Sequence, residues 1–411
     1  MTPADQARLL SELRPGLSVF VQGATGEPQG LIAALQSDPE RARGVAFTAP
    51  LIPGINSFDY AGLHPEAELT TFMAAESLRA SIDAGRARII PLCYSQIAKT
   101  VAAAAYDVAV LQLTPPDANG RCSFGVSSDF GPLAWRRAGR RIGIINPAMA
   151  RPPRSETVAF SALDLTVEDD SPLIATDEPA PSPVLTAIAA HVASLIPDGA
   201  ALQTGVGGAP AATLAQLTDR RDLVIRSGMI TEGYRTLAKA GALARSNQHI
   251  TGIAYGSADF YAWLRDTDLT AFASVKHTHG AAELGETPSF MAINSALEVD
   301  LFGQANLEWR GGRAISGVGG APDFARGAAA SQGGRSIIAM PSTAKAVSRI
   351  TARLTSATVS LARTDVDTVV TEHGIAELRG KTLDERAEAL IAIADAAHRG
   401  ALTDAWRDLR R

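Results

Sequence analysis

Short apolar runs that alternate with helical patterns constrain the fold of this chain more than any other feature of its sequence. In the first half, such runs are separated by amphipathic segments at Leu31–Leu35 and Ser95–Ala105. Strands that alternate with helices predict a parallel sheet with helices on its faces. The expected strands of this half are Leu17–Val21, Val45–Thr48, Ala87–Pro91, Val108–Leu113 and Ile142–Ile145.

The same alternation returns after a stretch that suits neither a helix interior nor a central strand. Residues 169–184 read DDSPLIATDEPAPSPV, and their prolines lack a backbone donor and restrict the backbone. A helix is expected next, at 184–195, and amphipathic helices are expected at 383–409. The expected strands between them are Ala201–Thr204, Leu223–Ile225, Phe272–Ser274, Ser336–Met340, Thr358–Ser360 and Thr368–Thr371.

Length and spacing together favour two similar open α/β domains. The chain has 411 residues, enough for two substantial hydrophobic cores. We place the first domain at 1–175, a linker at 176–184 and the second domain at 185–411. In open α/β sheets, ligands bind at the carboxyl ends of the strands, so functional residues are expected there.

Charge and cysteine content exclude several classes of protein. Thirty-eight basic and 43 acidic side chains give a net charge of −5 with no long basic block, which argues against a nucleic-acid partner. The two cysteines, Cys93 and Cys122, lack metal-ligand spacing and suit a reducing compartment, so a cytoplasmic protein without a metal site is expected. No apolar run is long enough to cross a bilayer, so no membrane role is expected.

Two glycine-rich segments are the strongest candidates for a binding site. Ala201–Thr213 reads ALQTGVGGAPAAT, and Ser316–Phe324 reads SGVGGAPDF. A strand that runs into such glycines and then into a helix turns backbone amides toward a ligand, with no Cβ to block its approach. The pair could serve a large anionic ligand with several phosphates or carbonyls. Each could also merely turn a strand into a helix.

A third segment, Ile293–Gln304, carries polar side chains without a recognisable catalytic pattern. It reads INSALEVDLFGQ, in which polar and apolar residues are mixed. This alternation is consistent with a half-buried strand and by itself indicates no chemistry.

Taken together and in this order, these segments resemble the acetyl-CoA hydrolase/transferase family, the class I CoA-transferases that include 4-hydroxybutyrate and succinyl-CoA:acetate transferases. The resemblance covers nearly the whole chain. Besides the three segments above, it rests on GATGEP at 23–28, SFGVSSDF at 123–130, INP at 145–147, SGMITEG at 227–233, ARGA up to 328, GGRSIIAMPST at 333–343 and RTDVDTVVTEHGIAELRGKT at 363–382.

The resemblance implies two α/β domains of the CoA-transferase, NagB/RpiA-like type, with the active site at their interface in a homodimer. It implies coenzyme A as a substrate or product that is not bound permanently, with an acyl-CoA and a small carboxylate as reactants. A lysine that touches coenzyme A in relatives is replaced here by Gln332. The other implied coenzyme A contacts are Gly205, Val206, Gly207, Gly208, Ala209, Asn294, Ala296, Gly319 and Gly320.

One position departs from the family pattern. Family transferases carry a glutamate in a segment that reads His-Ser-Glu-Met-Ile-Ser-Asp-Gly, and its carboxylate attacks the thioester. The aligned run here is Arg226–Gly233, RSGMITEG, which places Gly228 at the nucleophile position. Glycine has no attacking group, and this argues against a covalent glutamyl mechanism.

Three other side chains are candidates for the chemistry. Glu232 would lie one turn from Gly228 if the segment were helical, either as a replacement nucleophile or as a structural acid near a helix start. His277 and His279, in KHTH, could activate water, and in a strand their rings would share a face. They could equally be solvated loop residues. His373, where relatives commonly carry an aromatic residue, is interpreted as structural.

The resemblance and the missing glutamate leave three functions open. The leading one is an enzyme of the CoA-transferase fold that transfers coenzyme A from an acyl-CoA to a carboxylate or hydrolyses the acyl-CoA. The second is an acyl-CoA lyase or hydrolase that uses water and a histidine base. The third is a non-catalytic subunit that binds a CoA ester.

Overall fold

The computed structural model describes residues 1–246, 248–356 and 358–410, which divide into two compact units. The first unit comprises Met1–Asp177, Ile250–Thr278 and Ile315–Gly317. The second unit is the rest of the described chain. The first unit therefore takes in two later segments beyond the domain expected at 1–175.

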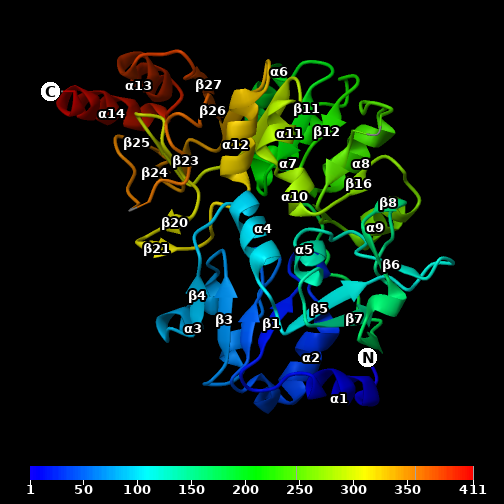
Figure 1. The fold of residues 1–411 in the computed structure, drawn as a ribbon. Helices are drawn as coiled ribbons and strands as arrows, with labels where there is room; N and C mark the ends of the chain where they lie inside the picture. The colour runs from blue at the N-terminus through cyan, green and yellow to red at the C-terminus, as the bar shows by residue number, and fades with distance from the viewer. Residues whose placement is uncertain (247, 357, 411) are drawn as a thin grey trace. The chain divides into compact units, whose positions relative to one another are not determined.

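A seven-stranded, all-parallel sheet forms the centre of the first unit, in the order β10-β7-β5-β1-β2-β3-β4 (Figure 1). Its strands are β1 (Ser18–Val21), β2 (Ala46–Thr48), β3 (Glu68–Thr71), β4 (Ala87–Ile89), β5 (Val108–Leu113), β7 (Arg140–Ile145) and β10 (Leu165–Glu168). The helices of this unit are α1 (Pro3–Ser11), α2 (Gln29–Ser37), α3 (Arg79–Asp83), α4 (Tyr94–Ala103), α5 (Gly131–Trp135), α9 (Ala258–Arg265) and α10 (Val275–Thr278). Its short accessory strands are β6 (Arg121–Ser123), β8 (Arg154–Ser155), β9 (Thr157–Ala159), β14 (Ile250–Thr251), β15 (Ile253–Ala254) and β16 (Ala271–Phe272).

Both faces of this sheet are buried, because alternate residues of one strand belong to different hydrophobic clusters. In β5, Val108 and Val110 pack in a cluster with α2, while Ala109 and Leu111 pack in a cluster with α4 and α5. A strand buried on both faces reads as a continuous apolar run. This explains why β5 was predicted with its observed bounds.

The second unit is built on a six-stranded sheet in the order β12-β11-β17-β22-β26-β27. The sheet is parallel except for the last pair, which is an antiparallel hairpin. Its strands are β11 (Ala201–Thr204), β12 (Val224–Ile225), β17 (Phe290–Asn294), β22 (Arg335–Ala339), β26 (Thr368–Thr371) and β27 (Gly374–Glu377). Short accessory strands are β13 (Met229–Ile230), β18 (Glu298–Asp300), β19 (Ala305–Asn306), β20 (Trp309–Arg310), β21 (Arg313–Ala314), β23 (Thr343–Ala344), β24 (Val347–Ser348) and β25 (Ile350–Thr351).

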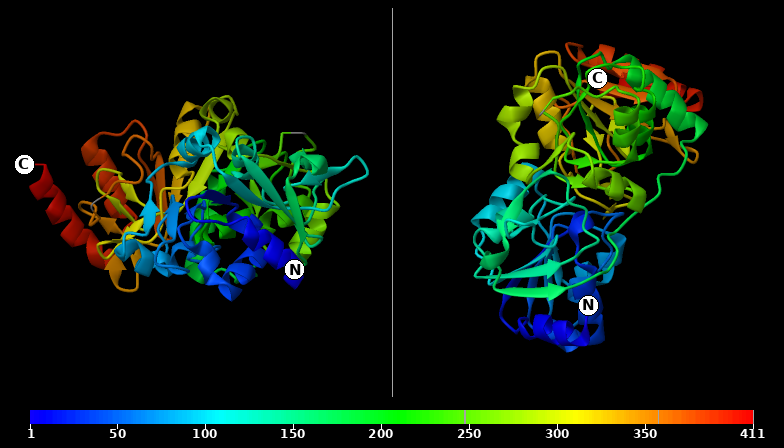
Figure 2. Two further views of the ribbon diagram at one scale, coloured as in Figure 1. Left: turned by 60° about the horizontal axis from the view of Figure 1, so that its bottom comes forward. Right: turned by 90° about the vertical axis from the view of Figure 1, so that its right-hand side faces the viewer.

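Helices cover the second sheet and its hairpin edge. The helices are α6 (Pro183–Ser194), α7 (Gly208–Ala215), α8 (Glu232–Lys239), α11 (Ala281–Gly285), α12 (Ala321–Ala330), α13 (Leu383–Ala392) and α14 (Ala396–Leu409). α12 packs on β17 and β22, while α6 packs on β22 and β26. α13 packs on β27, and the two C-terminal helices are red in Figure 2. Among the described residues, no helix is long and apolar enough to span a bilayer.

The α/β class and the parallel sheets expected from the sequence are confirmed, but three local predictions are wrong. The described residues Thr358–Ser360 do not form a strand; the amides of Ser360 and Leu361 instead both donate to the carbonyl of Ala305. Val275–Thr278 forms a helical turn, so strand geometry does not apply to KHTH. Ile293–Gln304 is not one half-buried strand: it contains the end of β17 (Phe290–Asn294) and the short strand β18 (Glu298–Asp300), and both strands are fully buried.

Candidate functional site

The first glycine loop lies at the carboxyl end of β11 and leads directly into α7. A Cβ on Gly205 would lie 2.5 Å from Oδ1 of Asn294, so only glycine fits this close approach. Gly207 has φ of 141°, which side chains rarely allow, and it is the N-cap residue of α7. Since this cap residue has no side chain, the first amides of α7 are available to an anionic group.

Asn294 is the last residue of β17, the strand next to β11, and its side chain lies directly against Gly205 of this loop. Its side-chain amide exchanges hydrogen bonds with that of Gln203, at 3.3 and 3.1 Å, and both residues are buried. The turn that follows is held by Arg349, whose guanidinium donates to the carbonyls of Ala296 and Leu297. Asn294 and the glycine loop are therefore positioned together at the carboxyl edge of the sheet.

The second glycine segment is divided between the two units. Gly317 belongs to the first unit, where a Cβ on it would lie 2.7 Å from the carbonyl oxygen of Phe72. Gly319 and Gly320 belong to the second unit; Gly319 has φ of 58°, and Gly320 is the N-cap residue of α12. The N-terminus of α12 thus resembles that of α7 in having a glycine in place of a side-chain cap.

The imidazole of His279 lies against two glycines of the second unit. A Cβ on Gly320 would lie 2.4 Å from Nε2 of His279, and a Cβ on Gly228 would lie 2.7 Å from Cε1 and 3.0 Å from Nε2. The ring also packs on Phe324 of α12, with 4.4 Å between the ring centroids. We call Gly228, Gly320, Phe324 and His279 the histidine slot. Neither glycine could carry a side chain while the ring holds this position.

Burial determines the charge of this imidazole. His279 is only 2% exposed, and its burial lowers the pKa to about 3. The ring is therefore neutral at physiological pH, with one nitrogen that donates a hydrogen bond and one that accepts. Such a group can take a proton from a water or a substrate hydroxyl.

Glu232 lies at the start of a helix and forms an ion pair. It opens α8, and its Oε2 lies 2.6 Å from Nη2 of Arg235 in an ion pair across the first turn. An acidic residue at a helix start is stabilised by the helix dipole. Gly228 and Glu232 are separated by β13, so the helical spacing considered for them is wrong.

The remaining predicted residues are dispersed. His277 lies in the helical turn α10 of the first unit, so the reason for placing its ring beside that of His279 is lost. Gln332 is exposed, and its backbone carbonyl accepts from the amide of Ser289 at 2.8 Å. Nε2 of His373 lies 3.8 Å from carboxylate oxygens of both Glu372 and Asp395.

Sequence reasoning missed two buried acids of the first unit, Glu27 and Asp129. Burial raises the pKa of each to about 7, although hydrogen bonds from Asn56 and Tyr60 to the Glu27 carboxylate act in the opposite direction. Both acids lie in motifs that carried the resemblance, GATGEP and SFGVSSDF. In each motif, a single acidic residue stands among small and apolar neighbours, and this pattern could have indicated a buried carboxylate.

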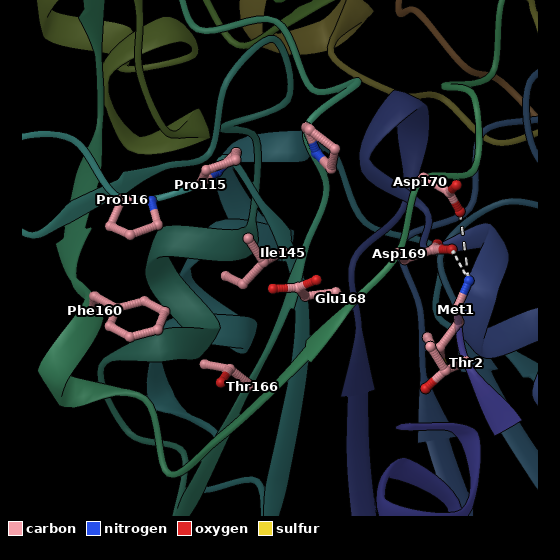
Figure 3. A pocket seen from close by; sticks show the side chains of 11 residues that line it. Met1, Thr2, Pro115, Pro116, Ile145, Phe160, Thr166, Glu168, Asp169 and Asp170 are labelled. Carbon is pink, nitrogen blue, oxygen red and sulfur yellow. Dashed lines mark hydrogen bonds and ion pairs between the residues drawn. The ribbon is translucent and has the colours of Figure 1, made fainter. Parts of the chain in front are cut away.

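The first unit also contains a cavity that none of the predicted residues lines (Figure 3). Its volume is about 670 Å³, with Pro115 and Phe160 among its apolar lining. The N-terminal ammonium of Met1 lies 3.2 Å from Asp169 and 3.5 Å from Asp170, which also line the cavity. Its acidic lining does not suit the phosphates of an anionic ligand.

Comparisons with known proteins agree with the resemblance. Family models match at residues 5–176, described as the acetyl-CoA hydrolase/transferase N-terminal domain, and at residues 256–406, described as the C-terminal domain. The chain is 34% identical to the 4-hydroxybutyrate coenzyme A transferase of Clostridium kluyveri, over 97% of this chain and 96% of the relative. It is 30% identical to a succinyl-CoA:cyclohexane-1-carboxylate CoA transferase of Geobacter metallireducens, over 94% and 91%. The crystal structure of RipA from Yersinia pestis matches with a TM-score of 0.91 and 28% identity, over 98% of this chain and 97% of that one.

Proposed function

The chain belongs to the acetyl-CoA hydrolase/transferase family and is an enzyme of its CoA-transferase or acyl-CoA hydrolase type, and from this premise we propose that it hydrolyses an acyl-CoA thioester without a glutamyl-CoA intermediate. One observation supports hydrolysis over transfer: the space into which a side chain at position 228 would extend is taken by the imidazole of His279. The position that aligns with the family nucleophile therefore has neither a carboxylate nor room for one.

Two further features support this proposal. Covalent transfer stores the acyl group and then coenzyme A on a side-chain carboxylate, which Gly228 cannot provide. The nearby carboxylate of Glu232 is committed to an ion pair with Arg235. Water needs no such storage step, so the thioester can be broken once it is bound and its carbonyl is polarised by backbone amides.

The coenzyme A moiety is assigned to the second unit. We place it along the loops Gly205–Ala209 and Gly319–Gly320, with Asn294 and Ala296 on the floor and Gln332 near the expected phosphate contact. The glycine N-caps of α7 and α12 support this assignment, since helix N-termini attract phosphate groups. A homodimer in the cytoplasm stays a prediction.

The proposed function is tested with a panel of acyl-CoAs incubated with the purified protein, with and without acetate or succinate. We expect free thiol to appear at the same rate whether or not a carboxylate is present, because water is the acceptor. Free thiol is followed with a thiol reagent and new CoA esters by mass spectrometry. A new CoA ester would contradict hydrolysis and restore transfer. Binding of acyl-CoA with neither product would instead indicate the non-catalytic subunit.

The binding assignment is tested by Gly205→Ala. The added Cβ would lie 2.5 Å from Oδ1 of Asn294 and must displace the loop or the amide pair. We expect the Kd for coenzyme A, measured by calorimetry, to rise about tenfold. The matched control is Gly400→Ala on α14, where a Cβ meets open space and affinity should not change. An unchanged Kd in Gly205→Ala would place coenzyme A away from this loop.

A further inference from the structure

We propose that the cavity of the first unit (Figure 3) binds a small organic cation, a protonated or quaternary amine that carries an apolar body. Its volume of about 670 Å³ is in the range of small-molecule sites, which are mostly apolar with a few polar groups that orient the ligand. The cavity belongs to the first unit, whereas the loops assigned to coenzyme A belong to the second. The inference therefore does not rest on the proposed hydrolysis.

The cavity lies at the carboxyl ends of three neighbouring strands of the seven-stranded sheet, β5, β7 and β10. Pro115 lies two residues after β5, Ile145 is the last residue of β7, and Glu168 is the last residue of β10. In open α/β sheets, ligands bind outside the carboxyl ends of the strands. The cavity therefore has the position that a ligand site in such a sheet is expected to have.

The strand register explains why Glu168 faces this cavity. In the parallel pair of β10 and β7, Glu168 is the partner of Ile145, and Thr166 lies two residues before it. Alternate residues of a strand share a face, so Val167, which packs in the cluster with α2, belongs to the opposite face. Figure 3 shows the Glu168 carboxylate directed toward Ile145 and that of Asp169 directed the other way.

Charge determines the kind of ligand that this cavity can hold. Its lining contains the carboxylates of Glu168, Asp169 and Asp170, and one cationic group, the N-terminal ammonium of Met1. That ammonium is paired with Asp169 and Asp170. Within the described part of the chain, the Glu168 carboxylate forms no hydrogen bond or ion pair. A cationic ligand would be attracted to this carboxylate, whereas a phosphate or a carboxylic acid anion would be repelled.

An exposed aromatic ring is the second feature that suits an organic cation. Phe160 lines the cavity, and 38% of it is exposed, which is unusual for a phenyl ring in this chain. The face of such a ring attracts a cation that lies within about 6 Å of its centre. Pro115 and Pro116 extend this apolar wall. A bare metal ion would leave the wall uncovered, so the ligand is expected to have an apolar body.

The experiment measures binding of the probe (3-hydroxyphenyl)trimethylammonium and of its neutral isostere 3-tert-butylphenol to the purified full chain by calorimetry. We expect the cation to bind at least about tenfold more tightly than the isostere, because both fill the same space and only the cation pairs with a carboxylate. Glu168→Gln should raise the Kd of the cation about fivefold and leave that of the isostere unchanged. Phe160→Leu keeps the wall apolar without a ring and should raise the Kd of the cation about threefold.

The matched control is Glu388→Gln, which removes an exposed carboxylate from α13 in the second unit and should change neither Kd. Equal affinity for the cation and the isostere would overturn the assignment of a cationic ligand. A Kd for the cation in Glu168→Gln within about twofold of wild type would overturn its placement in this cavity. No saturable binding of the cation below about 10 mM would overturn the proposal as a whole. Thiol release from acyl-CoA is measured separately, so none of these outcomes decides the proposed hydrolysis.

Discussion

The double variant Gly228→Glu/His279→Ala is expected to transfer coenzyme A from an acyl-CoA to acetate or succinate. The first substitution supplies the carboxylate that covalent transfer requires, and the second vacates the space into which it must extend. We expect the rate of new CoA-ester formation to rise at least ~100-fold above that of wild type, since a missing nucleophile is restored. The measurement is mass spectrometry of CoA esters, with trapping of the acylated carboxylate by hydroxylamine as a second readout.

The single substitutions are expected to fail for different reasons. Gly228→Glu alone places a Cβ 2.7 Å from Cε1 of His279, an overpacking that typically costs about 1–3 kcal/mol and leaves the carboxylate misplaced. His279→Ala alone has no nucleophile. The effects should therefore be strongly non-additive, as for residues in direct contact.

The matched control for this gain is Gly228→Gln/His279→Ala. Its amide has the shape of the carboxylate but cannot form an acyl anhydride, so no transfer is expected. Transfer by Gly228→Glu alone, at the rate of the double variant, would show that the histidine slot does not block position 228. No transfer by the double variant, if it is folded and binds coenzyme A, would contradict the alignment that places Gly228 at the nucleophile position.

Features that depend on local pattern could be predicted from the sequence. β5 and β11 have the predicted bounds, and for β5 the reason is a nearly continuous apolar run, which indicates a strand buried on both faces. The glycine loop at Gly205–Gly207 was recognised because strand, glycine and helix follow each other directly in the chain. The short strand β3 was missed, since ELTT at Glu68–Thr71 has one strongly apolar residue and its burial comes from β2 and β4.

The histidine slot could not be predicted, because its members are distant in sequence. Gly228, His279 and Gly320 are brought together by the fold, and Phe324 completes the slot from α12. The expectation that the rings of His277 and His279 share one face is wrong, because strand geometry was assumed where the chain forms a helical turn. The protonation states of Glu27, Asp129 and His279 could not be predicted from the sequence either, because their pKa values depend on burial rather than on sequence neighbours.

Removing the buried acids should stabilise the protein at alkaline pH. Burial raises the pKa of Asp129 from 3.8 to about 7, so the folded state binds a proton that the unfolded state releases. Protonated Asp129 therefore makes its full contribution to the free energy of unfolding below about pH 4. This contribution falls as the pH rises through 7, and it is constant above about pH 8. Asp129→Asn does not titrate, so relative to wild type it should gain stability across this window, by up to about 4 kcal/mol at pH 8. Glu27→Gln should act in the same direction by a smaller amount, since its pKa rises from 4.5 to about 7.

The contribution of His279 to the free energy of unfolding should depend on pH in the opposite direction, and urea unfolding can measure both effects. Its folded-state pKa lies below the ordinary value of 6.5, at about 3, so its contribution is present above pH 6.5 and is lost as the pH falls toward 3. Urea unfolding at pH 4, 6 and 8 should therefore show Asp129→Asn gaining little at pH 4 and most of its stability already at pH 6, and His279→Phe gaining mainly at pH 4. The control is the exposed Asp83→Asn, which should follow wild type at every pH. A gain in Asp129→Asn that is equal at pH 4 and pH 8 would show that relief of packing, rather than of a buried charge, is the cause.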